Sequence, residues 1–235
     1  MALADLRRDY GVSGLERKDL ADDPFAQFQG WFNQASASGS GAWWRRVALS
    51  LYKLWHALLG HSPVDVNAMV LATVDRQGVP SARTVLLKGV DRRGFIFYTN
   101  YDSRKGHELL ENPNAALVFF WPDLERQVCV AGTVTKLPTA ESEAYFKSRP
   151  RGSQLGAWAS HQSEVIANRE VLEAKQRELA ARFGSGDIPL PPNWGGYVLA
   201  PTRIEFWQGR ADRLHDRFRY SRQVDNSWKI ERLSP

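Results

Sequence analysis

The stretch AMVLATVDRQGVPSARTVLLKGVDRRGFIFYT, residues 68–99, contains three apolar runs separated by two polar turns. The runs cover 68–74, 81–90 and 95–99, and each connecting turn (DRQG, then DRRG) ends in glycine. Short apolar runs joined by glycine-containing turns are typical of an antiparallel meander. The stretch therefore predicts three consecutive antiparallel strands.

The rest of the chain adds short strands with helices between them. Apolar runs predict further strands at 115–121, 127–137, 197–199, 203–208, 213–220 and 228–233. Helical spacing or composition predicts helices at 3–10, 24–35, 103–111, 139–147 (with Thr139 as N-cap) and 169–183. This pattern predicts a mainly β (α+β) fold, an antiparallel β-barrel of six to eight strands with peripheral helices.

The segment 36–65 differs in composition from both of its neighbours. SASGSG at 36–41 has the composition of a flexible connector, and 43–59 combines a tryptophan-rich face with a basic face at helical spacing. Such a helix could contact a membrane surface or a partner, or pack on its own domain or a dimer mate. We therefore expect an N-terminal helical segment at 1–35, an inserted linker and amphipathic helix at 36–65, and the barrel at 66–235, forming a single domain overall.

Composition and charge exclude several classes of protein. The 235 residues are 43% hydrophobic and 24% charged, which is ordinary for a globular domain, and the net charge of +5 suits an anionic partner without selecting one. Cys129 is the only cysteine, so no intrachain disulfide can form. No run approaches the ~20 apolar residues of a membrane span, and the five histidines show no metal-ligand spacing. We expect a cytoplasmic protein without a metal.

Three short motifs gather cations in positions that favour an anion. In DSRK (102–105) two cations occupy the first turn of a predicted helix, where free amides and the helix dipole attract negative charge. In RPRGSQ (149–154) arginine and serine donors follow a helix that carries Tyr145. In RLHDR (213–217), read as a strand, alternate cationic side chains share one face. Each motif could also be a solvated turn, an exposed loop or a charged edge strand.

A fourth motif, RTVLLK (83–88), has the composition of a buried strand between two cations. Arg83 and Lys88 are five positions apart, so they face opposite sides of a regular strand. One site could use both only through a bulge, the geometry of the strand end or a second subunit.

Together these motifs resemble the pyridoxamine/pyridoxine 5′-phosphate oxidase family. The resemblance rests on blocks in the same order over most of the chain, and only about residues 36–65 fall outside it. The blocks are LRRDYG (6–11), DPFAQF (23–28), RTVLLK (83–88), FYTNYDSRK (97–105), LERQV (124–128), YFKSRPRGSQLGAWAS (145–160), WGGY (194–197), IEFWQGR (204–210), RLHDRFRY (213–220) and WKIERLSP (228–235).

The resemblance implies an FMN-binding split β-barrel that forms a homodimer with FMN between the subunits. It places FMN contacts on Arg83, Thr84, Val85, Leu86, Leu87, Lys88, Tyr98, Thr99, Arg104, Lys105, Gln127, Gln162, Ser163, Trp207 and Arg217. It places substrate contacts on Lys88, Tyr145, Arg149, Ser153, Arg213, Leu214 and His215, with Arg7 and Tyr10 closing over the substrate. Arg213 and His215 are the expected catalytic residues.

The implied reaction is the oxidation of pyridoxamine 5′-phosphate and pyridoxine 5′-phosphate to pyridoxal 5′-phosphate. O2 would be the electron acceptor, giving H2O2, and the amine would also release NH3. His215 could act as a base or only orient the substrate. Rival functions are another flavin or deazaflavin split-barrel oxidoreductase, a carrier that binds pyridoxal phosphate without oxidising its precursors, and a nucleic-acid-binding barrel, which the scattered cations disfavour.

Overall fold

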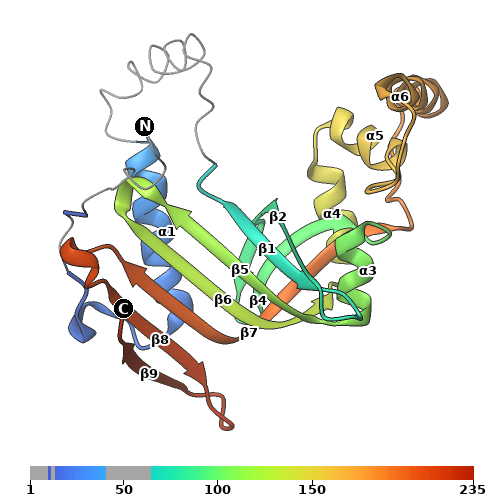
Figure 1. Ribbon diagram of the computed structural model, residues 1–235. Helices are drawn as coiled ribbons and strands as arrows, with labels where there is room; N and C mark the ends of the chain where they lie inside the picture. The colour runs from blue at the N-terminus through green and yellow to red at the C-terminus, as the bar shows by residue number, and fades with distance from the viewer. Residues whose placement is uncertain (1–9, 12–13, 41–64) are drawn as a thin grey trace. The chain divides into compact units, whose positions relative to one another are not determined.

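The computed structural model describes residues 10–11, 14–40 and 65–235 (Figure 1). The predicted helix at 43–59, most of the one at 3–10, and Arg7 lie outside the described residues. None of the helices in the described part of the chain is long and apolar enough to cross a membrane.

The described residues form helices and strands in alternation. The helices, including short 3-10 helices labelled η, are η2 Arg17–Asp19, α1 Pro24–Ser40, α3 Arg104–Glu111, η3 Pro122–Leu124, α4 Thr139–Ser148, α5 Arg151–Ala159, α6 Arg169–Phe183 and η4 Ala211–Arg213. The strands are β1 Ala68–Val74, β2 Pro80–Leu86, β3 Gly89–Asp91, β4 Gly94–Asn100, β5 Asn114–Trp121, β6 Arg126–Lys136, β7 Trp194–Gln208, β8 Asp216–Arg222 and β9 Trp228–Leu233.

The nine strands belong to one sheet of order β2-β1-β5-β6-β7-β4-β3, with β8 pairing with β7 and β9. The pairs β3–β4, β4–β7, β7–β8 and β8–β9 are antiparallel. The predicted fold class, mainly β with an antiparallel sheet and peripheral helices, is confirmed. The chain also divides into two compact units: unit 1 is Met1–Val70, Leu117–Ala131 and Pro201–Pro235, and unit 2 is Leu71–Ala116 and Gly132–Ala200.

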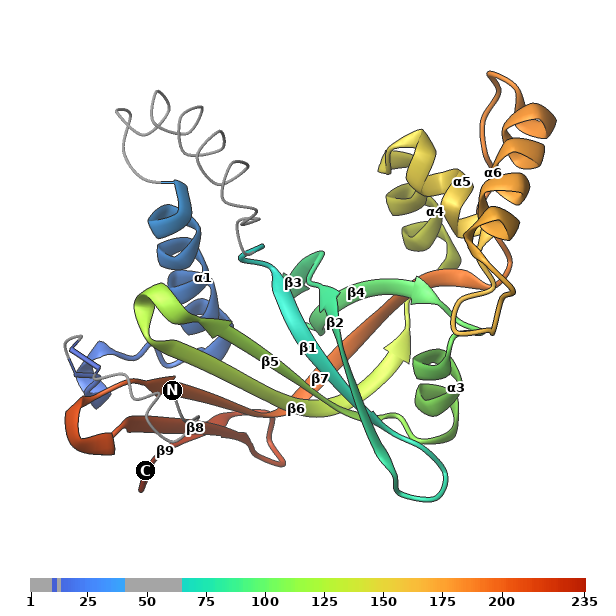
Figure 2. The same ribbon diagram turned by 45° about the horizontal axis from the view of Figure 1, so that its top comes forward.

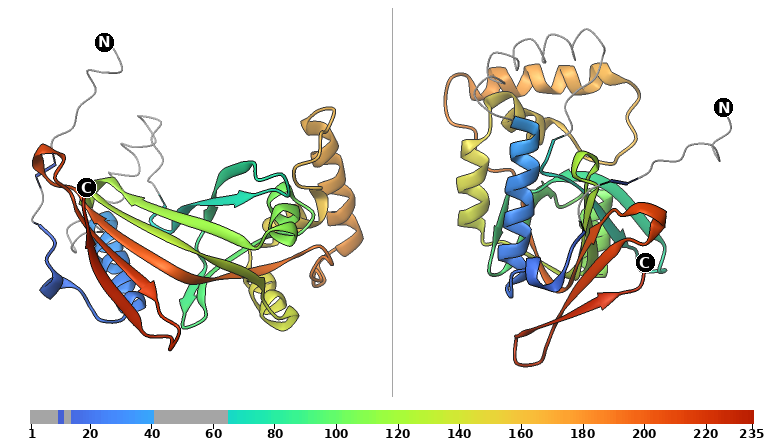
Figure 3. Two further views of the ribbon diagram at one scale, coloured as in Figure 1. Left: turned by 60° about the horizontal axis from the view of Figure 1, so that its bottom comes forward. Right: turned by 90° about the vertical axis from the view of Figure 1, so that its left-hand side faces the viewer.

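Unit 1 has a core of aromatic side chains between α1 and the strands. Phe28 lies 4.9 Å from Phe119, and Trp31 lies 5.1 Å from Phe206, as measured between ring centroids. These side chains lie on α1, β5 and β7, and almost none of their surface is exposed. The hairpin of β8 and β9 continues from the second half of β7, as Figure 3 shows.

Unit 2 combines a buried strand with a group of helices. β4 is almost entirely buried and pairs with β7 on one side and β3 on the other. It begins at Gly94, where φ is +145° and a Cβ atom would lie 1.9 Å from the carbonyl oxygen of Leu199, so only glycine fits. The helices α4, α5 and α6 group together (Figure 2) over a cluster that includes Phe146, Leu179 and Trp194.

Several strand predictions were wrong about where a strand begins or ends. The run 81–90 forms two strands, because the chain leaves β2 after Leu86 and the Lys88 amide donates to the Ile96 carbonyl (2.8 Å) before β3 begins. The predicted strands at 197–199 and 203–208 are instead parts of one strand, β7. The strand predicted at 213–220 is confirmed only from Asp216 onward, since η4 ends at Arg213 and β8 starts at Asp216.

The sequence also underestimated the extent of the helices in polar or glycine-rich segments, and it misplaced one helix cap. The predicted connector at 36–41 is helical as far as Ser40, because a helix that has already formed propagates cheaply through weak formers. RPRGSQ is not an exposed loop, since α5 starts at Arg151 directly after Pro150. Thr139 is not the N-cap of α4: Pro138 occupies that position and no side-chain cap bond forms.

Candidate active site

Unit 2 contains a cavity of about 950 Å³ that collects most of the predicted anion-binding residues. Its volume lies within the range usual for small-molecule sites, roughly 300–1,000 Å³. The predicted residues that line it are Arg83, Thr84, Val85, Leu86, Lys88, Tyr98, Thr99, Arg104, Lys105, Tyr145, Arg149, Ser153, Gln162 and Ser163. Leu87, predicted with them, does not line the cavity and is buried in the protein.

The start of α3 forms one end of the anion-binding set. Ser103 caps the helix by accepting a hydrogen bond from the amide of Gly106 (3.3 Å). The amide of Arg104, in the first turn, donates to the Ser163 hydroxyl (3.1 Å). Gly106 lets this turn approach Tyr101, because a Cβ atom would lie 2.0 Å from the Tyr101 carbonyl oxygen. The two cations of this helix start therefore line the cavity.

Lys105 is a buried cation whose hydrogen bonds all go to neutral oxygens. Its ammonium group donates to the Thr99 hydroxyl (3.1 Å), the Ser103 hydroxyl (3.2 Å) and the Gln162 amide oxygen (3.1 Å). Burial, and then the nearby charge of Arg83, lower the pKa of Lys105 to about 8. A bound anion would stabilise the charged form that burial disfavours.

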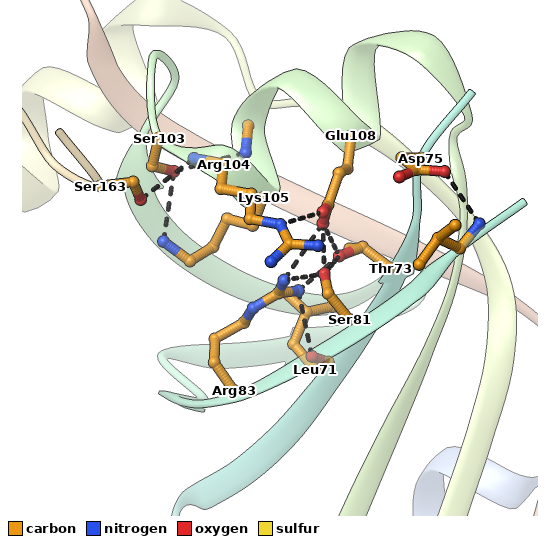
Figure 4. A network of polar contacts seen from close by, with 12 residues as sticks. Leu71, Thr73, Asp75, Ser81, Arg83, Ser103, Arg104, Lys105, Glu108 and Ser163 are labelled. Carbon is orange, nitrogen blue, oxygen red and sulfur yellow. Dashed lines mark hydrogen bonds and ion pairs between the residues drawn. The ribbon is translucent and has the colours of Figure 1, made fainter. Parts of the chain in front are cut away.

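Glu108 connects the two arginines of this set (Figure 4). Its carboxylate accepts hydrogen bonds from Arg104 Nε (2.8 Å) and Arg83 Nη2 (3.1 Å), and from the hydroxyls of Thr73 (2.5 Å) and Ser81 (2.6 Å). Burial raises the pKa of Glu108, but these donors together outweigh it and lower the pKa to about 2. Glu108 therefore stays ionised and fixes both guanidinium groups at the cavity.

Replacing Glu108 by glutamine is expected to lower the free energy of unfolding by about 2 kcal/mol at pH 7, because buried donors lose a charged acceptor. A lowered pKa stabilises the folded state above the unfolded pKa, so the wild type loses this contribution as the pH falls from about 4.5 towards 2. Urea unfolding should show that the difference in free energy of unfolding between wild type and Glu108→Gln is less than half as large at pH 3 as at pH 7. Glu111→Gln, at an exposed position of the same helix, is the control and should unfold with the same free energy as wild type. Equal free energies of unfolding for wild type and Glu108→Gln at pH 7 would refute the expectation.

The junction of α4 and α5 provides a second set of donors. Arg149 is the C-cap of α4, Ser153 lies in the first turn of α5, and Tyr145 precedes both on α4. One terminal nitrogen of Arg149, Nη1, is buried and has no hydrogen-bond partner in the described part of the protein. Burial lowers the pKa of Arg149. Buried donors in proteins are rarely left without a partner, so this nitrogen is an exception that needs an acceptor.

The geometry of a strand end allows Arg83 and Lys88 to serve one site. Arg83 lies on β2, which ends at Leu86, and Lys88 follows the buried Leu87 before β3 begins. Both cations line the same cavity within one chain.

Unit 1 holds the other predicted residues, several of which lie close together. The rings of Tyr10, Trp207 and His215 have centroids 4.6 to 5.7 Å apart. Trp207 is directly opposite Arg217 in the β7–β8 pair, and Arg217 pairs with Glu205 (2.8 Å). The remaining predicted residues in unit 1 are Gln127, Arg213 and Leu214. Gln127 donates a hydrogen bond to Cys129 Sγ (3.2 Å), and Leu214 is largely exposed.

The turn before β8 replaces the first three residues of the predicted strand, 213–215, and sets the position of His215. Asp212 and Arg213 both have positive φ values, 56° and 61°. Such backbone is unfavourable for residues other than glycine and tends to occur at functional sites. His215 Nδ1 accepts a hydrogen bond from the Arg210 amide (3.1 Å), so the neutral ring carries its proton on Nε2.

Sequence reasoning missed several residues of the site. The cavity is also lined by Ser81, Ala82, Asn100, Pro150, Gly156, Ala157, Ser160 and Trp194, and Glu108 and Thr73 support it. The spacing of Arg104 and Glu108, four residues apart on a predicted helix, was a signal that could have found the ion pair. Among the described residues no group of three or more potential metal ligands occurs.

Comparisons with known proteins give consistent results. A family profile described as pyridoxamine 5′-phosphate oxidase matches residues 64–183, and one described as pyridoxine 5′-phosphate oxidase C-terminal dimerisation region matches 194–235. Proteins named pyridoxine/pyridoxamine 5′-phosphate oxidase from Nostoc punctiforme and Cupriavidus metallidurans are each 52% identical over 233 residues. The alignments cover 99% of this chain, and 98% and 99% of the respective relatives.

Two solved structures resemble the chain. PhzG from Burkholderia lata, solved in complex with tetrahydrophenazine-1-carboxylic acid, has a TM-score of 0.80 and 30% identity, covering 97% of this chain and all of PhzG. A pyridoxamine 5′-phosphate oxidase-related, FMN-binding protein from Nostoc punctiforme has a TM-score of 0.59 and 21% identity, covering 84% of this chain and all of that one. The second similarity concerns the fold alone.

Proposed function

Because the chain belongs to the pyridoxine/pyridoxamine 5′-phosphate oxidase family, we propose that it oxidises pyridoxine 5′-phosphate and pyridoxamine 5′-phosphate to pyridoxal 5′-phosphate. The alcohol and O2 give the aldehyde and H2O2; the amine, O2 and water give the aldehyde, NH3 and H2O2. The observation that carries the proposal is the pair of cationic donor sets in one cavity, one around Lys105 and one around Arg149. They suit two phosphorylated molecules, a cofactor and a substrate.

The donor set around Lys105 fits the phosphate of FMN. Arg83, Arg104 and Lys105 supply positive charge, and the Ser163 and Gln162 side chains add polar atoms beside them. Lys105, whose hydrogen bonds go only to neutral oxygens, would be stabilised by the anion. When bound, FMN supplies the two-electron acceptor that no protein side chain provides.

The donor set around Arg149 fits the phosphate of the substrate. The buried Nη1 of Arg149 needs an acceptor, and Lys88, Tyr145 and Ser153 line the same cavity. A phosphate ester offers several oxygens to such donors, and arginine binds it through two parallel hydrogen bonds. These residues should therefore supply binding energy and place the ring of the substrate.

Arg213 and His215 are proposed to act on the substrate ring. Since His215 Nδ1 accepts a backbone hydrogen bond, its Nε2–H can donate to a substrate oxygen or nitrogen. This favours an orienting role over that of a general base, which would need an unprotonated Nε2. Arg213, held in a turn of unfavourable backbone, would keep the substrate in place.

We also propose a homodimer whose subunits jointly enclose each flavin. The predicted contacts Trp207, Arg213, His215 and Arg217 all lie within residues 194–235, which match a dimerisation region. Gln127 would join them from β6 in unit 1.

The proposal is tested by the absorption spectrum of the purified protein and by a peroxide assay with both vitamers. We expect the visible absorbance of a flavin, a yellow colour that apoprotein regains with FMN, and equal amounts of H2O2 and pyridoxal 5′-phosphate. Flavin binding without turnover of either vitamer would indicate an oxidoreductase for another substrate. Binding of pyridoxal 5′-phosphate without any flavin binding would indicate a carrier.

A further inference from the structure

The indole ring of Trp194 supports the guanidinium group of Arg149. Cζ of Arg149 lies 4.6 Å from the centroid of this ring, well within the range of about 6 Å for cation–π contacts. The ring of Phe146 is a second neighbour at 5.6 Å. Because Nη1 has no hydrogen-bond partner, the aromatic rings are prominent among the contacts that hold this cation in place.

Two tyrosines hold Trp194 in a fixed orientation. The ring of Tyr98 is 5.6 Å from it at an angle of 12°, and the ring of Tyr145 is 6.2 Å away at 6°. The two tyrosine rings stack at 3.9 Å. Tyr98 is opposite Gly196 in the β4–β7 pair, where a Cβ atom would lie 2.8 Å from Tyr98 Cε1. The Trp-Gly-Gly sequence thus provides both the indole ring and the space that keeps Tyr98 flat beside it.

We propose that Trp194 is a positioning residue for phosphate recognition, which holds Arg149 ready for the substrate before the substrate arrives. A long arginine side chain loses rotational freedom when it binds a ligand, and a preformed support removes that cost. Trp194 contacts Arg149 and Tyr145 but belongs to a different strand, β7, so it links the two donors of α4 to the sheet. The inference rests on the proposed function, because it assigns a phosphorylated substrate to this part of the cavity.

Trp194 also packs in the core, and an informative test must separate the two roles. Its side chain is 7% exposed and lies in a cluster with Phe146, Leu155 and Leu179. A cavity anywhere in this cluster would loosen α4 and α5. Leu179→Ala, on α6, makes such a cavity, and Leu179 does not line the active-site cavity.

The experiment compares Trp194→Leu, Trp194→Phe and Leu179→Ala in FMN-loaded protein. For Trp194→Leu we expect the KM for pyridoxine 5′-phosphate and the inhibition constant of inorganic phosphate each to rise about tenfold. The kcat and the dissociation constant of FMN should stay within about twofold of wild type. Trp194→Phe keeps an aromatic face and should recover most of the loss, to within about threefold of the wild-type KM.

Three outcomes would overturn the inference: an unchanged KM in Trp194→Leu, an equal rise in KM in Leu179→Ala, or a loss confined to FMN binding. Thermal unfolding of all three variants shows whether each is folded under assay conditions; if Trp194→Leu is not, Trp194→Met takes its place.

A wild-type protein that oxidises neither vitamer would refute the proposed function instead. Wild-type turnover with a normal KM in Trp194→Leu would refute only the role of Trp194.

Discussion

Replacing Arg149 by alanine is expected to raise the KM for pyridoxine 5′-phosphate about 100-fold and to change kcat only slightly. The variant loses two charge-assisted hydrogen bonds to phosphate, each worth about 1.5–3 kcal/mol, and part of the loss is recovered when water enters the site. Phosphate is remote from the reacting carbon, so its binding energy is the same in the ground state and in the transition state. Loss of such uniform binding appears in KM and not in kcat.

Arg151→Ala is the matched control for this variant. Arg151 is two residues away, is exposed, and donates to the carbonyls of Gly184 and Gly186 (2.7 Å for the latter) instead of lining the cavity. It should leave KM within about twofold of wild type. Arg149→Lys should lie between wild type and Arg149→Ala, because it keeps the charge but loses the paired donors. A fall in kcat with an unchanged KM would show that Arg149 acts on the chemical step.

The sequence allowed much of the unit 2 site to be predicted, because its residues come in short blocks with local geometry. The first turn of α3 brings Ser103, Arg104 and Lys105 together within three residues. The end of α4 does the same for Tyr145 and Arg149. Cations in the first turn of a helix, as in α3, are unfavourable without an anion, and this signal needs no knowledge of long-range contacts.

Two sets of supporting contacts could not be predicted, since they join residues that lie far apart in the sequence. Trp194 reaches Tyr98 through the register of β4 with β7, and Glu108 reaches Thr73 and Ser81 from α3. No local pattern encodes these contacts. In unit 1, Tyr10 lies beside Trp207 and His215 although about 200 residues separate them in the sequence.

The turn before β8 shows a different limit. Alternation of polar residues in RLHDR favoured a strand, but Asp212 and Arg213 adopt positive φ values. Aspartate visits this region more readily than most residues, whereas arginine has no such preference. The conformation is therefore imposed by the surrounding structure, and a pattern of side chains cannot reveal it.

Replacing Lys105 by methionine is expected to weaken FMN binding about 100-fold while leaving riboflavin binding within about twofold. Lys105 is buried among neutral oxygens, and the lost ammonium removes a charge-assisted contact of about 1.5–3 kcal/mol to the phosphate. Riboflavin has the same ring without the phosphate, so the comparison isolates that group. Titration of apoprotein, followed by quenching of flavin fluorescence, measures both dissociation constants.

The pKa of Lys105, lowered to about 8 by burial, adds a pH dependence to the same measurement. Below pH 8 the free protein carries the charged ammonium; above it the proton is lost, and bound phosphate favours its return. The dissociation constant of FMN should therefore rise about tenfold between pH 7 and pH 9.5 in wild type. Riboflavin binding, and FMN binding to Lys105→Met, should not show this rise. Lys175→Met, on the surface of α6, should show the same rise as wild type. A rise in Lys105→Met as large as that of wild type would assign the titration to another group.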